Sequence, residues 1–190
     1  MAGFAITFDD GPDPTWTPRL LDGLAALGGH ATFFPIASRA AAHPDLIERM
    51  CAAGHTIGLH CDEHVRHSER DTAWLRHDTR NALALLATLG IRPVLWRTPW
   101  GDTAPWSAQV AREYGLRLVG WTVDTQDWRG DTAEEMFDAT SQAIEAGPVV
   151  LAHDGVGPGA RRDTAAETVR YVELTGAYAR SCGLTIEALS

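Results

Sequence analysis

Lysine is missing from the 190-residue chain, in which all 16 basic residues are arginine. Without lysine, the chain has no candidate for a Schiff-base nucleophile or for the phosphate-binding lysine of a P-loop. The basic residues are outnumbered by 25 acidic ones, which gives a net charge of −9. A chain this acidic is a poor partner for nucleic acids or anionic membranes. We therefore expect neither as a binding partner.

Cysteines and long apolar runs are also scarce. Cys51, Cys61 and Cys182 are odd in number, far apart and outside any C-x-x-C pair, as expected for reduced thiols. No segment approaches the ~18 consecutive apolar residues of a membrane span. The sequence that starts at Met1 lacks the basic and apolar regions of a secretory signal. The sequence as it stands predicts a cytoplasmic protein, or a secreted one if a leader has been removed.

The remaining composition is that of an ordinary globular protein. Hydrophobic residues make up 45% of the chain and charged residues 22%, which excludes disorder and a disulfide-stapled miniprotein. The length corresponds to roughly one domain of ~150 residues. Because no repeat, low-complexity tract or linker interrupts the sequence, we expect a single domain over residues 1–190.

Short β-rich runs alternate with longer amphipathic stretches along the chain. Strands are expected at Phe4–Phe8, Ala31–Ile36, Thr56–Leu59, Val94–Trp96, Leu118–Val123, Val149–Ala152 and Leu184–Ile186. Helices are expected at Pro18–Leu27 with Thr17 as N-cap, and at Pro44–Ala53, Ser68–Leu89, Pro105–Tyr114, Thr132–Glu145 and Thr164–Arg180. This alternation predicts an α/β fold with a mainly parallel sheet.

Polar clusters directly follow several of these strands. They are Asp9-Asp10, His60 to His64, Arg97 to Gly101, Asp124 to Trp128 and His153-Asp154. Functional loops at the C-terminal ends of successive strands are typical of a (β/α) barrel. With about seven strands instead of the usual eight, the barrel should be irregular or open.

The first cluster, Thr7-Phe8-Asp9-Asp10-Gly11-Pro12, brings two adjacent carboxylates into a turn. Adjacent side chains at a strand end point in different directions, so one aspartate can bind a metal while the other moves a proton. A structural turn with Asx hydrogen bonds is the alternative interpretation.

The second cluster places His60 and His64 four residues apart after an apolar strand. On one helical turn this spacing can direct two nitrogens at a single ion, although a chance pair on a solvated turn fits equally well. Cys61 lies off the shared face, and we interpret it as a packed thiol.

Two further residues stand out by their surroundings. Arg97 lies between Trp96 and a second tryptophan, so its guanidinium should be partly desolvated and should need a carboxylate partner. His153 follows the most apolar strand, Val149–Ala152, where it is either functional or a hydrogen-bonded structural histidine.

In this order, the motifs resemble the polysaccharide deacetylase family of metal-dependent carbohydrate esterases, which includes chitin, peptidoglycan and chitooligosaccharide deacetylases. The resemblance runs from T-F-D-D-G-P through H-x-x-x-H to the late L-x-H around His153, and covers nearly the whole chain. It implies an irregular (β/α) barrel and hydrolysis of an N-acetyl group to acetate and a free amine.

The resemblance also implies roles for individual residues. Asp9 corresponds to the general base paired with Arg97, and His153 to the general acid paired with Asp127. The implied metal ligands are Asp10, His60 and His64, with Zn²⁺ the expected ion and Co²⁺ or Mn²⁺ alternatives. The implied substrate-binding residues are Pro99, Trp100 with its backbone N–H on the oxyanion, and Trp128 and Leu151 around the acyl methyl.

Some positions depart from the family pattern. Leu59 stands where asparagine is common, Cys61 where Ser or Thr steadies the metal loop, Thr98 where proline is frequent, and Trp100 where Tyr or Phe is usual. The first two substitutions bear on metal affinity, and the bulkier Trp100 suggests a differently shaped cleft.

A small N-acetylated sugar, a short oligosaccharide or another small amide is the expected substrate. An O-acetyl esterase and a catalytically silent sugar-binding or metal-binding module are the alternatives. Together, the base, acid and ligands favour the enzyme, whereas the sequence does not separate N-deacetylation from O-deacetylation or predict the oligomeric state.

Overall fold

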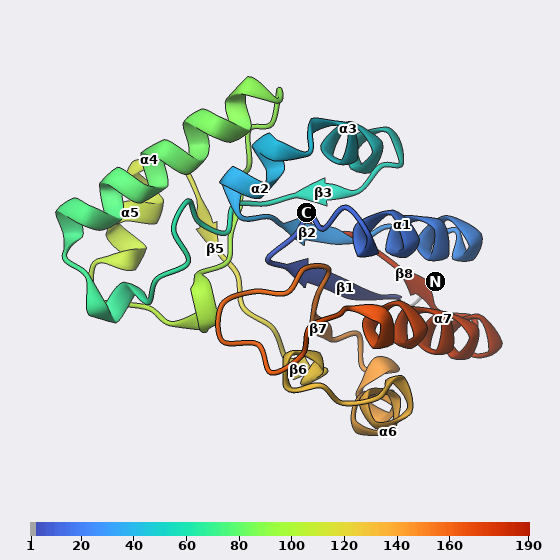
Figure 1. The fold of residues 1–190 in the computed structure, drawn as a ribbon. Coiled ribbons are helices and arrows are strands. Elements are labelled where there is room, and N and C mark those ends of the chain that lie inside the picture. Colours follow the sequence, from blue (N-terminus) through green and yellow to red (C-terminus); the bar gives the residue numbers. More distant parts are fainter. Residues whose placement is uncertain (1–2) are drawn as a thin grey trace.

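A parallel β-sheet lies at the centre of the molecule (Figure 1). The computed structural model describes residues 3–190, so Met1 and Ala2, with which the expected domain begins, lie outside the described residues. Five strands pair in the order β3-β2-β1-β7-β6, and β8 also pairs with β1. Their bounds are Gly3–Asp9 (β1), Thr32–Phe34 (β2), Thr56–Ile57 (β3), Val123–Asp124 (β6), Val149–His153 (β7) and Thr185–Ile186 (β8).

A second, two-stranded sheet extends this arrangement into an irregular barrel. It consists of β4 (Leu95–Trp96) and β5 (Arg117–Leu118), and a single parallel bridge between Leu59 and Trp96 connects it to the segment after β3. Within residues 3–190, no strand ladder joins β5 to β6. The α/β fold and the irregular (β/α) barrel expected from the sequence are therefore confirmed, with an opening between these two strands.

Several predicted strands are shorter in the structure, among them Ala31–Ile36, which is reduced to Thr32–Phe34, and one is divided in two. Leu118–Val123 was expected to be continuous, but the chain leaves the smaller sheet after Leu118 and enters the larger one at Val123. The Gly120 carbonyl between them accepts a hydrogen bond from Arg97 (2.8 Å) instead of joining a ladder. The barrel consequently has eight short strands in the described residues.

Seven helices surround the strands in the described part of the chain. They are α1 (Trp16–Leu27), α2 (Ala37–Ala42), α3 (Pro44–Ala52), α4 (Thr72–Thr88), α5 (Ser107–Glu113), α6 (Ala133–Ile144) and α7 (Ala166–Ser181). In Figure 1, α1 is seen above β1 and α7 below it, while α4 and α5 lie together on the far side of β5. None of these helices is long and apolar enough to cross a membrane.

Two predicted helix starts were wrong, and one helix was missed. Helix α1 starts at Trp16, and Thr17 is not its N-cap, because its hydroxyl instead donates to the buried Asp154 carboxylate (2.6 Å). Helix α4 starts at Thr72 and not at Ser68, since the Asp71 side chain caps it by accepting from the Trp74 N–H. The six-residue helix α2 was not predicted, because it directly follows a strand and is too short to show a clear periodicity.

The apolar core fills the space between the strands and the helices. Its largest fully buried apolar side chains include Phe8, Phe33, Trp96 and Tyr171. Strand β1 is buried from Phe4 to Asp9, and Asp9, its final residue, lies at the C-terminal edge of the sheet. This edge carries the polar clusters noted in the sequence.

Candidate active site

A cavity of about 520 Å³ opens at the C-terminal ends of the strands. Its walls come from four regions: the end of β1, the 60–66 loop, segments 100–128, and β7 with the loop that follows it. The lining residues are Asp9, Asp10, His60, His64, Arg66, Trp100, Trp121, Asp124, Trp128, Leu151, His153, Gly155, Gly157, Pro158, Gly159, Ala160, Arg161 and Arg162.

The end of β1 presents its two aspartates to different neighbours. Asp9 is the last strand residue, and Asp10 adopts a left-handed conformation (φ 72°) that turns the chain out of the sheet. The Asp154 carboxylate accepts a hydrogen bond from the Gly11 N–H (3.2 Å) and fixes this turn. A Cβ at Gly11 would lie 2.0 Å from that carboxylate, so the close approach requires glycine here.

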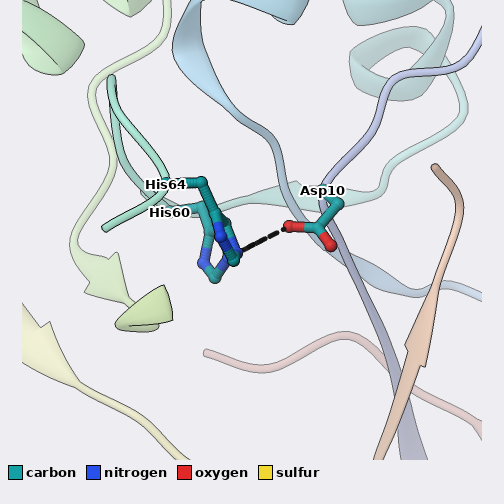
Figure 2. A group of neighbouring side chains, drawn as sticks. All are labelled: Asp10, His60 and His64. Carbon is teal, nitrogen blue, oxygen red and sulfur yellow. Dashed lines mark ion pairs between the residues drawn. The ribbon is translucent and has the colours of Figure 1, made fainter. Parts of the chain in front are cut away.

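Asp10 faces the two histidines of the H-x-x-x-H pattern (Figure 2). Its Oδ1 lies 3.3 Å from His60 Nε2 and 3.2 Å from His64 Nε2. Burial alone would raise the pKa of Asp10, but its contacts with the two imidazoles hold the pKa well below the usual range. The three side chains form a group whose donor atoms lie within 4.8 Å of one another.

The geometry of this group fits a divalent ion. The His60 Nδ1 must donate to the Arg97 carbonyl (2.7 Å), so the neutral ring directs a lone pair from Nε2 at Asp10 Oδ1. The Oδ1 atom itself is buried and receives no hydrogen bond from the described residues. Two facing acceptors require a cation between them or a proton on the ring. Ligand atoms ~2.0–2.1 Å from one tetrahedral ion lie roughly 3.4 Å apart, close to the separations observed.

On one side of this group, Asp9 is paired with Arg97. The guanidinium donates to Asp9 Oδ1 (3.1 Å), to the Thr7 hydroxyl (2.5 Å) and to the Gly120 carbonyl (2.8 Å). Arg97 is fully buried at 0% exposure and lies over the Phe34 ring at 4.4 Å. A buried arginine requires a carboxylate partner, as the sequence predicted.

On the other side, His153 is paired with Asp127. His153 Nδ1 donates to Asp127 Oδ1 (2.7 Å), and the His153 backbone N–H donates to Oδ2 (2.9 Å). Burial alone would lower the pKa of His153, but the charge and hydrogen bond of Asp127 raise it to about 9. Burial opposes ionisation of Asp127, yet His153 and then Arg162 lower its pKa to about 2. This pair therefore holds a protonated imidazole at the cavity.

The polysaccharide deacetylase family profile matches residues 3–119 of this chain. The chain belongs to the polysaccharide deacetylase family. It is 35% identical over 153 residues to a peptidoglycan-N-acetylglucosamine deacetylase of Bacillus cereus, covering 80% of this chain and 72% of that protein. To a chitooligosaccharide deacetylase of a Bradyrhizobium species it is 36% identical over 172 residues, covering 87% and 76%.

A solved structure extends the similarity over the whole deacetylase fold. It is a family 4 carbohydrate esterase from Streptomyces lividans in complex with acetate, which aligns with a TM-score of 0.88 and 28% identity. The alignment covers 100% of this chain and 93% of that one. As a member of this family, the chain is a hydrolase of the deacetylase type. The family is metal-dependent, and the group of Asp10, His60 and His64 is able to hold an ion.

Not all of the predicted substrate-binding residues of this deacetylase lie at the cavity. Trp100, Trp128 and Leu151 line the cavity, whereas Pro99 is buried and does not line it. Trp100 is 40% exposed, adopts a left-handed conformation (φ 55°) and packs its ring 4.1 Å from that of His64. Its bulk thus lies directly beside the metal-binding group.

Asp78 was not predicted, although it supports the histidine loop. From α4, its Oδ1 accepts from the Glu63 N–H (2.7 Å) and its Oδ2 from the Asp62 N–H (3.3 Å). Cys61 is a buried thiol, as interpreted from the sequence, and is outside the metal-binding group. Asp78 therefore anchors the loop, a role that the family pattern gives to Ser or Thr at position 61. Its place on the buried face of α4, between Leu75 and Ala82, was the available signal.

Arg162 was also missed, and it completes the His153 side. Its NH1 lies 3.1 Å from Asp127 Oδ2, and its NH2 donates to the His153 carbonyl (2.9 Å). Thr168 on α7 donates to the same Asp127 oxygen (2.8 Å). The doubled arginine after His153 hinted at a role, but the sequence does not reveal which arginine turns inward.

Proposed function

We propose that the protein removes the N-acetyl group from a small N-acetylated sugar or short oligosaccharide, with Zn²⁺ as its ion. The observation that carries this proposal is the position of Asp9 and His153, which are paired residues on the neighbouring parallel strands β1 and β7. Both line the cavity next to Asp10, His60 and His64. A proton acceptor and a proton donor thus flank one metal-binding group.

Asp10, His60 and His64 would hold the ion, which when bound polarises an amide carbonyl and acidifies water in the site. Three protein ligands leave a position open, as in catalytic zinc sites. In the reaction, Asp9 accepts a proton from the attacking water, and Arg97 keeps the carboxylate in place. The backbone N–H of Trp100 is the proposed donor to the oxyanion.

His153 then gives its proton to the departing nitrogen, the C–N bond breaks, and acetate and a free amine are released. An amine is a poor leaving group unless it is protonated, so the elevated pKa of His153, about 9, favours N-deacetylation over O-deacetylation. The same feature argues against a silent binding module, which needs no buried proton donor. The predicted cytoplasmic location stays a prediction.

The test is mass spectrometry of acetyl loss from N-acetylglucosamine, its oligomers and its polymer, with and without added Zn²⁺, and with O-acetylated sugars in parallel. We expect acetate and free amine from mono- or oligosaccharides. Faster loss of O-acetyl groups would favour the esterase, and an intact panel in the presence of bound metal would overturn the proposal.

The metal assignment is tested separately by elemental analysis of the purified protein. The double variant His60→Ala, His64→Ala should lose its bound zinc. The variant His77→Ala removes an exposed histidine on α4 and should keep it. Unchanged zinc content in the double variant would contradict the ligand assignment.

A further inference from the structure

Two arginines whose side chains have no polar partner among residues 3–190 lie at the cavity. In residues 3–190, ten of the 16 arginine side chains form a hydrogen bond or ion pair, and six form neither. The six are Arg19, Arg66, Arg70, Arg92, Arg112 and Arg161. Only Arg66 and Arg161 of these six line the cavity.

Arg66 is held in place by stacking. Its guanidinium carbon lies 4.6 Å from the centre of the Trp100 ring, and that ring packs 4.1 Å from His64. The Trp100 indole therefore contacts a metal-binding imidazole edge-on (interplanar angle 68°) and also carries the stacked guanidinium of Arg66. Stacking leaves the guanidinium N–H groups available at the edge of the plane.

Stacking alone does not distinguish Arg66. Arg19 lies 4.8 Å from the Trp16 ring and Arg70 lies 5.3 Å from the Trp74 ring, but neither lines the cavity. What sets Arg66 apart is its position beside the site of the reaction. Arg161 approaches the same cavity from the loop after β7, where its backbone N–H donates to the Trp128 carbonyl (2.8 Å).

The other charges at the cavity are largely compensated within the protein. Asp9 is paired with Arg97, and His153 with Asp127. Among the described residues, Asp124 is the remaining lining carboxylate outside the metal-binding group, and it accepts from the Gln126 N–H (2.8 Å). Arg66 and Arg161 thus leave an excess of positive charge at the cavity of a chain whose net charge is −9.

We propose that Arg66, together with Arg161, binds an anionic group, a carboxylate or a phosphate, carried by the N-acetylated substrate. The proposal rests on the proposed deacetylase function and narrows its substrate class to acidic N-acetyl sugars. A guanidinium offers several donors in one plane, which matches the oxygens of either group, and the stack on Trp100 reduces the entropy lost on binding.

The experiment compares three monosaccharides with the zinc-loaded protein: neutral N-acetylglucosamine, N-acetylmuramic acid as the carboxylate, and N-acetylglucosamine 6-phosphate as the phosphate. We expect at least one acidic sugar to have a kcat/KM about tenfold or more above that of the neutral sugar, as one charged hydrogen bond provides. The preferred acidic sugar identifies the anion. Equal values for all three would overturn the proposal while leaving the deacetylase function intact.

Variants separate binding by Arg66 from support of Trp100. In Arg66→Gln the ratio of acidic to neutral kcat/KM should fall about tenfold, and in Arg66→Lys it should fall less, because the charge remains. Arg161→Gln should lower the ratio by a smaller factor. The control Arg19→Gln removes the matched stacked arginine away from the cavity and should leave the ratio unchanged. An equal loss for acidic and neutral sugars in Arg66→Gln would contradict anion binding.

A binding measurement keeps the proposal testable without turnover. Calorimetry of the Asp9→Asn protein with each sugar should show tighter binding of the acidic sugar, and the added Arg66→Gln change should remove that difference. If no sugar is deacetylated but this difference appears, the deacetylase function fails and the anion site stands. If the sugars bind alike, the anion site fails.

Discussion

Each side of the cavity contains an aspartate paired with an arginine, but the two aspartates have opposite roles. On one side, Arg97 contacts a single oxygen of Asp9, and the carboxylate lines the cavity. On the other, both oxygens of Asp127 are occupied by His153, Arg162 and Thr168, and the carboxylate does not line the cavity. One carboxylate is available to accept a proton, and the other serves to keep a proton on its neighbour.

The difference lies in the number of donors around each carboxylate. Asp9 receives one side-chain hydrogen bond, from Arg97, which also donates to Thr7 and Gly120. Asp127 is 1% exposed and forms part of a network joining β7, α7 and the loop after β7. Asp9 and Asp127 could not exchange roles unless the hydrogen bonds around both carboxylates were rebuilt. The surroundings of each aspartate, and not the residue type, therefore decide whether it accepts a proton or keeps one on its neighbour.

The largest effect should follow from Asp9→Asn. The amide cannot accept the proton, so kcat/KM should fall ~10²–10⁴-fold, while Arg97 keeps its contacts with Thr7 and Gly120 and the fold persists. Steady-state kinetics and zinc analysis on the same sample measure both effects. Asp138→Asn removes an exposed carboxylate on α6 and should leave the rate unchanged. Near-wild-type turnover of Asp9→Asn would end its assignment as base.

The next effect concerns the alkaline limb of the pH profile. Because the acid must be protonated, kcat/KM should fall as pH rises through about 9, the raised pKa of His153. In Asp127→Asn the carboxylate charge is lost, and the limb should move to lower pH by ~1–3 units. A limb that stays in place would show that another group supplies the proton.

The same pKa makes stability depend on pH. Since the folded value of about 9 exceeds the ordinary 6.5, the contribution of His153 to the free energy of unfolding is complete below pH 6.5 and disappears as pH rises through 9. Tm should therefore decline over this window in the wild type and decline less in Asp127→Asn. Equal slopes for both proteins would argue against the pairing.

Arg162→Gln tests the part of the comparison that the sequence did not predict. Loss of a positive charge near the pair should shift the alkaline limb upward, opposite to the effect of Asp127→Asn. Breaking a buried ion pair should lower the free energy of unfolding by ~3–5 kcal/mol. Arg170→Gln breaks exposed ion pairs with Glu134 and Glu167 and should cost at most ~1 kcal/mol. Denaturant titrations and pH profiles distinguish a charge effect from simple loss of structure.

The smallest effect is expected at Leu151, the proposed contact for the acyl methyl in the cavity. Leu151 lies on β7 at 4% exposure and lines the cavity, so Leu151→Ala should shift the preference for acetyl over butyryl amides by ~1–3 kcal/mol. Leu95→Ala removes an equally buried leucine from β4, away from the cavity. It should lower stability without changing the acyl profile. Matching profiles for both variants would remove Leu151 from the acyl pocket.

The sequence predicted the site well because its residues follow strand ends. Asp9, His60 and His153 directly follow apolar residues, Asp10 and His64 come one and four residues later, and parallel strands bring their C-terminal ends to one edge. Arg162 and Asp78 were not predicted, because they act from a loop and a helix whose side-chain directions depend on tertiary packing. A local pattern does not show which of two adjacent arginines turns inward.

The fold, like the site, was predicted where a local pattern defines it and missed where tertiary contacts do. Long strands and helices such as β1 and α6 were found within about two residues, since their periodicity is clear. The division of Leu118–Val123 between two sheets was missed because both pieces are β-rich, and only pairing with β4 and β7 separates them. The start of α4 was misplaced because Asp71, and not an earlier residue, caps it.

The loop after β7 also determines how this enzyme can be remodelled. Its segment from Gly155 to Arg162 supplies seven of the eighteen lining residues, all but Val156, whereas the metal-binding side chains come from elsewhere. Within it, a Cβ at Gly157 would lie 1.8 Å from the Asp10 carboxylate, and Arg162 is committed to Asp127. Positions 158, 160 and 161 are free of these two constraints, whereas Gly159 has a left-handed backbone (φ 86°) that strains other residues. Natural variation or directed evolution confined to these three codons can therefore change substrate range while the hydrolytic machinery is inherited intact.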